Sequence, residues 1–385
     1  MKTFIRGALC LSLSLLGCET ADPVATPLEV GPDVAAEVDS AVDSAATDAL
    51  DAEAGPSCGT EIVTGSLDDA SCKPRADDYV PGSATDGWPA CISDDATYHR
   101  FAASISTIAR VDAFDRIRVL LRFGTDVAPS TTDFVNARLA YTEVEGLESR
   151  VSRREDEHYP AAPKACRDLT ADEQKLYPDR CVGPVKIQPM LNDAFAAGAT
   201  GKDPVLNAAR VEAALLWFLF VSPYKETRTC ATAQADCDSG WAYYTGGDDD
   251  RTLEGRGFAR YVRARSKQAH DAIWNGLLAV RCWRDLDNPT GLAADLALRD
   301  RAVDQLDRAL IRGLTVVVRQ RLDRLACGGT WESTRILGAV LDREATKRDA
   351  TKAAALRAEL AKVDATTVDV KAAKAALDGL FGCPY

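Results

Sequence analysis

The sequence predicts an all-α protein, a multi-helix bundle with a loop-rich, disulfide-braced lobe at its N-terminal side. Three observations predict this class. Apolar residues recur every three or four positions over most of the chain after residue 99, which is the period of amphipathic helices. Strand patterns are scarce, and most of the 17 prolines lie in the first half. Ten cysteines follow residue 57, the even number that five disulfides in an exported protein require.

The first 17 residues have the pattern of an export signal. Lys2 and Arg6 precede a short apolar run, which is too short for the roughly 20 residues of a membrane-spanning helix. The run ends in Leu15-Leu16-Gly17-Cys18, which resembles the lipobox of bacterial lipoprotein precursors. The resemblance implies that residues 1–17 are removed and that Cys18 carries a lipid that attaches the protein to the membrane. An ordinary signal peptide cleaved elsewhere is the alternative.

The segment that follows, residues 18–57, is predicted to be a disordered acidic tether behind the lipidated cysteine. Residues 19–57 hold ten acidic residues, no Lys or Arg and no aromatic residue, so they cannot bury enough apolar surface to fold. The formal charge of the chain is -12, but residues 58–385 hold 44 basic and 48 acidic residues. Nearly balanced charge gives no indication of a nucleic-acid partner.

The rest of the chain divides by composition into two parts. Residues 58–98 are rich in Gly, Pro, Asp and Ser and contain three cysteines, which predicts a loop-rich lobe. Residues 99–385 are predicted to form the helical domain. The expected helices share the three-four apolar spacing or a helix-start signal, and they span residues 98–122, 132–154, 171–177, a stretch after Pro189, 204–221, 257–285, 296–325, 331–362 and 367–380.

Three of these helices have identifiable start or stop signals, and two others show a packing seam. Thr170 and Glu173 form a capping box, in which each side chain bonds the other's exposed backbone amide. Asp203 caps the helix over 204–221, which is apolar nearly all round and is therefore the expected buried centre, ended by Pro223. The helices over 257–285 and 296–325 present the regular seam of a bundle. Thr366, with Asp369 three residues on, opens the last helix.

The cysteines outside the leader are predicted to pair as disulfides. They are Cys58, Cys72, Cys91, Cys166, Cys181, Cys230, Cys237, Cys282, Cys327 and Cys383. Metal binding is the rival interpretation, but no pair has the C-x₂-C spacing of a zinc ribbon. The expected local pairs are Cys166 with Cys181 and Cys230 with Cys237, because each pair brackets a short loop.

One candidate metal motif is the Glu155-x-x-His158 spacing, which on a helix places a carboxylate and an imidazole on one face. Ferritin-like di-iron proteins use this unit twice, and neither of the other two histidines has a glutamate three residues before it. The alternative is a charged helix end, because Pro160 follows.

A second candidate is a basic stripe for an anionic ligand. Arg263, Lys267 and Trp274 share a helical face with His270. The alternative is a solvated basic face on which the imidazole stacks against the indole.

A third candidate is the loop that begins at Tyr243 and Tyr244, which are candidate ligand contacts. Asp248, Asp250 and Glu254 follow two glycines and could offer oxygen ligands to calcium. Their spacing does not match an EF-hand, so a hydrated loop tip is the alternative.

These observations predict an exported lipoprotein of the bacterial cell envelope, in the periplasm or at the outer-membrane surface. No G-x-S-x-G, H-E-x-x-H or Walker motif is present, so a binding or structural role is favoured over an enzyme, with an envelope protein or a small ligand as partner and no cofactor. The architecture is similar to that of imelysin-like helical lipoproteins, but the sequence around His270 reads Gln268-Ala269-His270-Asp271-Ala272-Ile273, not their G-x-H-x-x-E motif. The alternative function is a metal-dependent or iron-related protein that uses His270 or His158 with nearby acids.

Overall fold

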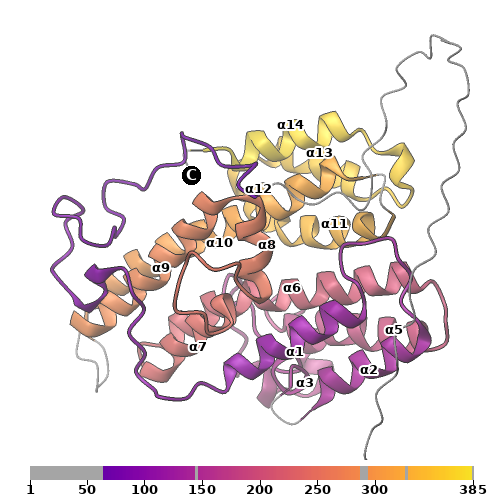
Figure 1. Cartoon of the computed structure of the whole chain (residues 1–385), viewed down its shortest axis with the longest axis horizontal. Coiled ribbons are helices and arrows are strands. Elements are labelled where there is room, and N and C mark those ends of the chain that lie inside the picture. The colour runs from indigo at the N-terminus through magenta and orange to yellow at the C-terminus, as the bar shows by residue number, and fades with distance from the viewer. Residues whose placement is uncertain (1–63, 144–145, 287–293, 326–327, 384–385) are drawn as a thin grey trace, which may run out of the picture. The chain divides into compact units, whose positions relative to one another are not determined.

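A computed structural model describes residues 64–143, 146–286, 294–325 and 328–383 (Figure 1). The chain divides into two units, Met1–Glu53 and Ala54–Tyr385, and the first lies wholly outside the described residues. The predicted leader, Cys18 and the tether therefore also lie outside them.

The described part of the second unit is all-α, as predicted, and contains no strand. Its helices are α1 (Thr107–Leu120), α2 (Thr131–Thr142), α3 (Glu148–Val151), α4 (Ala171–Gln174), α5 (Gln188–Ala199), α6 (Pro204–Thr229), α7 (Gln234–Thr245), α8 (Gly257–Arg265), α9 (Lys267–Leu286), α10 (Leu296–Asp323), α11 (Gly328–Val340), α12 (Asp342–Arg348), α13 (Ala350–Leu360) and α14 (Val370–Phe381). Short helical turns lie at Ile92–Asp95, Cys166–Asp168, Gly183–Ile187 and Ala365–Thr367.

Helix α6 is the buried centre of the bundle and contacts α5, α7 and α11 (Figure 1). It is also the one described helix that is long and apolar enough to cross a membrane. Since 78% of its apolar window is buried within the protein, α6 has the burial of a core helix.

The prediction that Pro223 ends this helix is wrong, because α6 continues to Thr229. Proline lacks an N–H and leaves one helical carbonyl without its partner. Ser222 Oγ donates to the carbonyl of Phe218 at 2.5 Å, and Pro223 and Thr227 are buried. Tertiary packing of the last turns therefore offsets the lost hydrogen bond.

Two predicted long helices are interrupted at polar caps. The helix expected over 257–285 breaks at Ser266, whose hydroxyl accepts from Ala269 N and donates to Asp68 in the N-terminal segment. The helix expected over 331–362 is three helices, and Asp349, which is extended, caps α13 at the amides of Thr351 and Lys352.

Other helix boundaries also differ from prediction. α1 begins at Thr107, not near residue 98, because Asp238 of α7 binds the amides of Phe101 and Ala102 and holds this segment non-helical. The helix expected over 132–154 ends at Thr142, and only α3 follows in that range. Asp369 is itself the cap of α14. The Thr170 capping box at α4 is confirmed.

The described part of the loop-rich lobe, residues 64–98, packs directly against the long helices. Tyr79 is fully buried, and both its backbone amide and its carbonyl bond Gln305 of α10. Asp78 forms an ion pair with Arg308, also of α10. Helices α9 and α10 approach closely at Gly276, where a Cβ would lie 2.7 Å from Leu306 Cα.

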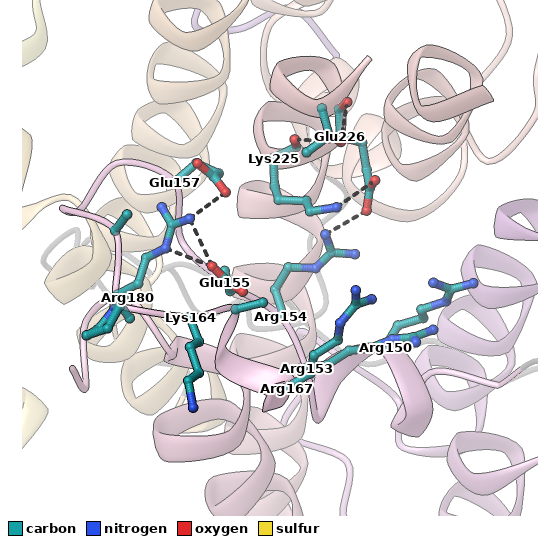
Figure 2. A pocket seen from close by; sticks show the side chains of 15 residues that line it. Arg150, Arg153, Arg154, Glu155, Glu157, Lys164, Arg167, Arg180, Lys225 and Glu226 are labelled. Atoms are coloured by element: carbon teal, nitrogen blue, oxygen red, sulfur yellow. Dashed lines mark hydrogen bonds and ion pairs between the residues drawn. The ribbon is translucent and has the colours of Figure 1, made fainter. Parts of the chain in front are cut away.

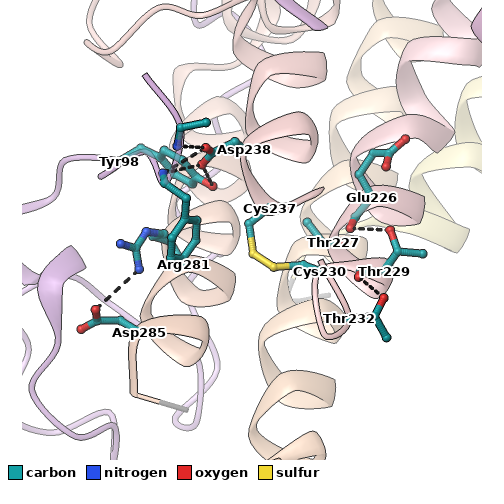
Figure 3. Close-up of a disulfide and its surroundings, with 12 residues drawn as sticks. Tyr98, Glu226, Thr227, Thr229, Cys230, Thr232, Cys237, Asp238, Arg281 and Asp285 are labelled. Carbon is teal, nitrogen blue, oxygen red and sulfur yellow. Dashed lines mark hydrogen bonds and ion pairs between the residues drawn. A yellow bond between two sulfur atoms is a disulfide. The ribbon is translucent and has the colours of Figure 1, made fainter. Parts of the chain in front are cut away.

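Four disulfides hold the described residues together. Both predicted local pairs, Cys166–Cys181 and Cys230–Cys237, are confirmed (the second in Figure 3). Cys72–Cys383 and Cys91–Cys282 connect the N-terminal lobe to the C-terminus and to α9 across 311 and 191 residues. Cys58 and Cys327 lie outside the described residues.

Candidate functional site

A cleft of about 520 Å³ lies between the loop that follows α3 and the last turns of α6 (Figure 2). We call it the arginine cleft. Its charged lining residues are Arg150, Arg153, Arg154, Glu155, Glu157, Lys164, Arg167, Arg180, Lys225 and Glu226, and its uncharged ones are Ala161, Ala162, Pro163, Ala165 and Thr229. The cleft thus has seven basic and three acidic side chains.

The loop that carries the arginines is fixed against the turn at Gly183–Ile187. A Cβ at Gly183 would collide with the Val151 carbonyl and would lie 2.6 Å from the Arg154 amide, so only glycine allows this approach. Gly183 N donates to the Arg154 carbonyl at 2.9 Å, and Asp156 N donates to the Arg180 carbonyl at 2.8 Å. The backbone of the cleft is therefore held on both sides of Arg154.

Disulfides brace two walls of the arginine cleft. Cys166 and Cys181, each directly adjacent in sequence to a lining arginine, form a small apolar cluster with Leu169, separate from the main core. Cys230 follows Thr229 and is bonded to Cys237 at the start of α7 (Figure 3). Because a disulfide limits how far its two ends can separate, the loop wall and the α6 wall are both anchored next to the cleft.

At the base of the cleft, Arg154 and Lys225 share one carboxylate. Arg154 donates to Glu226 at 2.7 Å, and Lys225 contacts the other carboxylate oxygen at 3.1 Å. The Arg154 guanidinium also lies 5.0 Å from the ring centroids of both Phe218 and Tyr243. Burial opposes ionisation of Glu226, but the two cations lower its pKa below the usual value. Arg154, Lys225 and Glu226 therefore form a fixed, charged group at the base of the cleft.

Arg180 forms the opposite wall and is neutralised. Its guanidinium pairs with Glu155 at 2.9 Å and with Glu157 at 2.6 Å, and Arg228 lies 3.8 Å from the second carboxylate. These two bases and two acids balance, so this wall carries no net charge. The neighbouring wall residues Ala161, Ala162, Pro163 and Ala165 are small and uncharged.

The remaining cations are open. Among the described residues, Arg150, Arg153 and Lys164 have no carboxylate partner within 4.0 Å, and Arg167 contacts only the exposed Asp168, at 3.7 Å. Figure 2 shows Arg150, Arg153 and Arg167 together on the side of the cleft away from Arg180. Burial and the nearby positive charge of Arg150, with a smaller effect of Arg167, lower the pKa of Arg153. Like charges are therefore gathered here without compensation.

Two hydrogen-bond donors at the cleft are also unused. The Nε atoms of Arg150 and Arg154 are buried and have no partner among the described residues, whereas buried polar groups are normally bonded. A guanidinium offers a planar fork of N–H groups that matches carboxylate and phosphate oxygens. The arginine cleft is therefore suited to bind an anion.

The structure does not bring Glu155 and His158 together as a metal pair, because both lie in a loop. Glu155 accepts from the amide of Cys166 and from Arg180. His158 is held between Asp156, 2.5 Å from Nδ1, and Asp307, 2.7 Å from Nε2. Burial opposes its charge, but these carboxylates raise the pKa of His158 to about 9. Both ring nitrogens are thus already engaged.

The predicted basic stripe around His270 is not an open surface. His270 is buried, with Nδ1 2.9 Å from the Tyr244 hydroxyl and Nε2 3.1 Å from the Arg251 carbonyl. Burial, with the charge of Arg263, lowers the pKa of His270 to about 4. Arg263 donates to the carbonyls of Arg251 and Thr252.

The other members of that stripe lie at the ends of two helices. Trp274 is buried, with its ring centroid 6.1 Å from that of His270. Lys267 begins α9 and is exposed, on the far side of the break at Ser266 from Arg263. The break therefore separates residues that one continuous helix would align.

The loop after Tyr243 and Tyr244 also uses its polar groups internally. Both tyrosines are buried in α7. Asp248 lies 3.4 Å from Arg256, and Glu254 lies 3.0 Å from Arg260. Asp250 accepts from the amide and hydroxyl of Thr252. The three acids therefore have separate partners.

One further group of ligand-type side chains occurs in the described part of the chain. Asp69 lies beside Cys72 and Cys383, but these two sulfur atoms are joined as a disulfide. A cysteine in a disulfide is not a thiolate ligand, so this group is explained by the bridge.

The basic residues of the arginine cleft were not singled out from the sequence. The available signal was Arg150-Val151-Ser152-Arg153-Arg154, which holds three arginines in five positions. The acidic run directly after it obscured the local excess of positive charge. The structure separates the two sets, since the acids pair with Arg180 and the first arginines do not.

Comparisons with known proteins do not assign a function to the arginine cleft. No protein-family model, curated protein or solved structure gives a significant match to the chain.

Proposed function

We propose that the protein is an exported, lipid-anchored binding protein of the bacterial cell envelope, whose helical domain holds an anionic ligand in the arginine cleft. The observation that carries the proposal is the group of Arg150, Arg153, Lys164 and Arg167 in a cleft with braced walls. Among the described residues, its one acidic partner is the exposed Asp168, 3.7 Å from Arg167. Anchoring follows from the lipobox resemblance at Cys18.

Two features support export. Four disulfides join eight of the ten cysteines outside the leader, and such bridges persist in oxidising compartments such as the periplasm. The buried cysteines Cys166, Cys181, Cys230 and Cys237 all serve as braces, so the fold depends on an environment that allows oxidation.

The arrangement supports binding through preorganisation. Arg154, Lys225 and Glu226 hold one another in place before any ligand arrives, and the backbone at Arg154 is fixed by Gly183. An anion that enters therefore meets a backbone and a charged base that are already ordered, which reduces the ordering entropy that opposes binding. Partial burial strengthens each charge interaction relative to bulk water.

Among the described residues, neither His158 nor His270 has a free ring nitrogen for the metal-dependent alternative. His158 and His270 each use both ring nitrogens for hydrogen bonds within the protein. Binding a metal at either imidazole would require one of these contacts to break. We therefore propose anion binding in the arginine cleft rather than metal binding at these histidines.

Thermal unfolding of the mature protein in non-ionic detergent tests the proposal. A ligand that binds only the native state raises its stability in proportion to RT ln(1 + [L]/Kd), so millimolar phosphate, sulfate or citrate should raise Tm at constant ionic strength. The charge reversal Arg153→Glu should abolish the increase, whereas the matched control Lys175→Glu, at the exposed C-terminal cap of α4 and outside the cleft, should retain it. A Tm of the unaltered protein that none of these anions raises would contradict the proposal.

A further inference from the structure

The charges of the arginine cleft are divided between two sides. On one side, Arg150, Arg153 and Arg167 gather with no internal carboxylate (Figure 2). On the other side, Arg180 is balanced by Glu155 and Glu157. The cleft is therefore polarised, with a strongly cationic end at these three arginines and, around Arg180, a nearly neutral end at which Lys164 is the one cation without an acidic partner among the described residues (Figure 2).

The excess positive charge gives a measure of the ligand's charge. Seven basic and three acidic side chains line the cleft, so four positive charges are uncompensated there. One phosphoryl group carries about -1.5 to -2 at pH 7, and a diphosphate, in which a bridging oxygen replaces one ionisable hydroxyl, carries roughly -3. A single phosphate would leave about two cations repelling one another, whereas a diphosphate offsets most of the excess.

The geometry of the donors favours phosphoryl oxygens over carboxylates. Three guanidinium groups must be satisfied at one end (Figure 2), and the buried Nε of Arg150 has no partner among the described residues. Each phosphoryl group presents three strong acceptor oxygens on one centre, while a carboxylate presents two in a plane. Compact, clustered acceptors suit several neighbouring arginine forks better than separated carboxylates do.

The neutral end restricts what is attached to the anionic group. Ala161, Ala162, Pro163 and Ala165 offer small apolar contacts, and none of the lining residues is aromatic. An aromatic base would find no ring to stack on, which is the usual means of holding it. The volume of about 520 Å³ lies within the range of small-molecule sites.

From this polarisation we infer that the ligand of the arginine cleft is a small molecule with two linked phosphoryl groups and an uncharged, non-aromatic body. The phosphoryl groups lie among Arg150, Arg153 and Arg167, and the body lies along the wall of Ala161, Ala162, Pro163 and Ala165. This inference rests on the proposed function, because it specifies the ligand of the same site.

Isothermal titration calorimetry on the mature, disulfide-intact protein tests the inference with inorganic pyrophosphate, orthophosphate and citrate at equal ionic strength. Pyrophosphate should bind at least tenfold more tightly than either other anion. Arg153→Ala should weaken pyrophosphate binding about tenfold or more and reduce its advantage over orthophosphate. Lys175→Ala should leave all three affinities unchanged. Arg150→Ala provides a second variant if Arg153→Ala fails to fold.

The outcomes separate the two claims. Equal binding of pyrophosphate and citrate, or of pyrophosphate and orthophosphate, would overturn the diphosphate inference and leave the anion site intact. Binding that Arg150→Ala and Arg153→Ala do not change would overturn the inference as well, because the anion would lie elsewhere. No binding of any anion would overturn both the inference and the proposed function.

Discussion

The buried side chain of His158 gives a quantitative prediction about how the free energy of unfolding depends on pH. His158 is almost completely buried, lies between Asp156 and Asp307, and stacks on Tyr224 with ring centroids 4.1 Å apart. Its pKa in the folded protein is raised to about 9, from 6.5. The native state therefore retains a proton that the unfolded chain releases between these values.

A raised pKa contributes stability that is fully present below the unfolded pKa and is lost as pH rises through the folded one. The shift from 6.5 to about 9 corresponds to about 3 kcal/mol at 1.36 kcal/mol per pKa unit. The side chain is only 5% exposed, so no reduction for solvent screening applies. We expect the free energy of unfolding to fall by about 3 kcal/mol between pH 6 and pH 9.5.

Equilibrium urea unfolding, followed by tryptophan fluorescence, measures this loss. His158→Gln removes the titrating group and keeps a polar side chain, so the variant should be less stable at pH 6 but should lack the histidine's share of the pH dependence. If the variant loses as much stability between pH 6 and pH 9.5 as the unaltered protein, His158 is not a charged link between the two aspartates and the reasoning fails.

Three further predictions concern the support of the cleft and its anchor. Gly183→Ala should lower the free energy of unfolding by about 2 kcal/mol or more, since its Cβ would collide with the Val151 carbonyl, and should weaken anion binding; unchanged urea unfolding and affinity would refute this. Replacing Cys166 and Cys181 together by Ala should cost about 3 kcal/mol, the value expected for a 15-residue loop, and a calorimetric Tm equal to that of the unaltered protein would count against it. Cys18→Ser should remove the lipid-dependent mass and release the protein from membranes on fractionation; retention with lipid would show attachment elsewhere.

Much of the fold was predictable because it depends on local pattern. The helical period gave the all-α class, the apolar run after Asp203 indicated the central helix, and the spacing of Cys166 and Cys181 gave a correct local pair. These features need only neighbouring residues. The Thr170 capping box is likewise a contact between residues three positions apart.

The errors arose where distant residues decide the local structure. Ser266 interrupts a helical pattern because its hydroxyl bonds Asp68, about 200 positions earlier. The segment before α1 is held by Asp238 of α7, and α6 passes Pro223 because its last turns are buried. None of these partners is visible in the local sequence.

The candidate site was missed for a related reason. Arg150 lies in α3, Arg167 lies in the turn at Cys166–Asp168, and Arg153 and Lys164 lie in the loop between these elements. They line one cleft because Gly183 and the Cys166–Cys181 bridge fold that loop back. Conversely, the stripe around His270 looked open in sequence, but its imidazole is buried against Tyr244. These loop residues come together only in the tertiary structure, so the spacing of charged residues along the sequence did not reveal the site.

The central claim is that the arginine cleft binds anions, and locating a bound anion tests it most directly. Tungstate mimics a phosphoryl group and scatters X-rays anomalously. A crystal of the mature protein soaked in low-millimolar tungstate should show an anomalous peak within hydrogen-bond distance of Arg150 and Arg153, and the peak should vanish in Arg153→Glu. Peaks only at other surfaces, or an equal peak in the variant, would contradict the account.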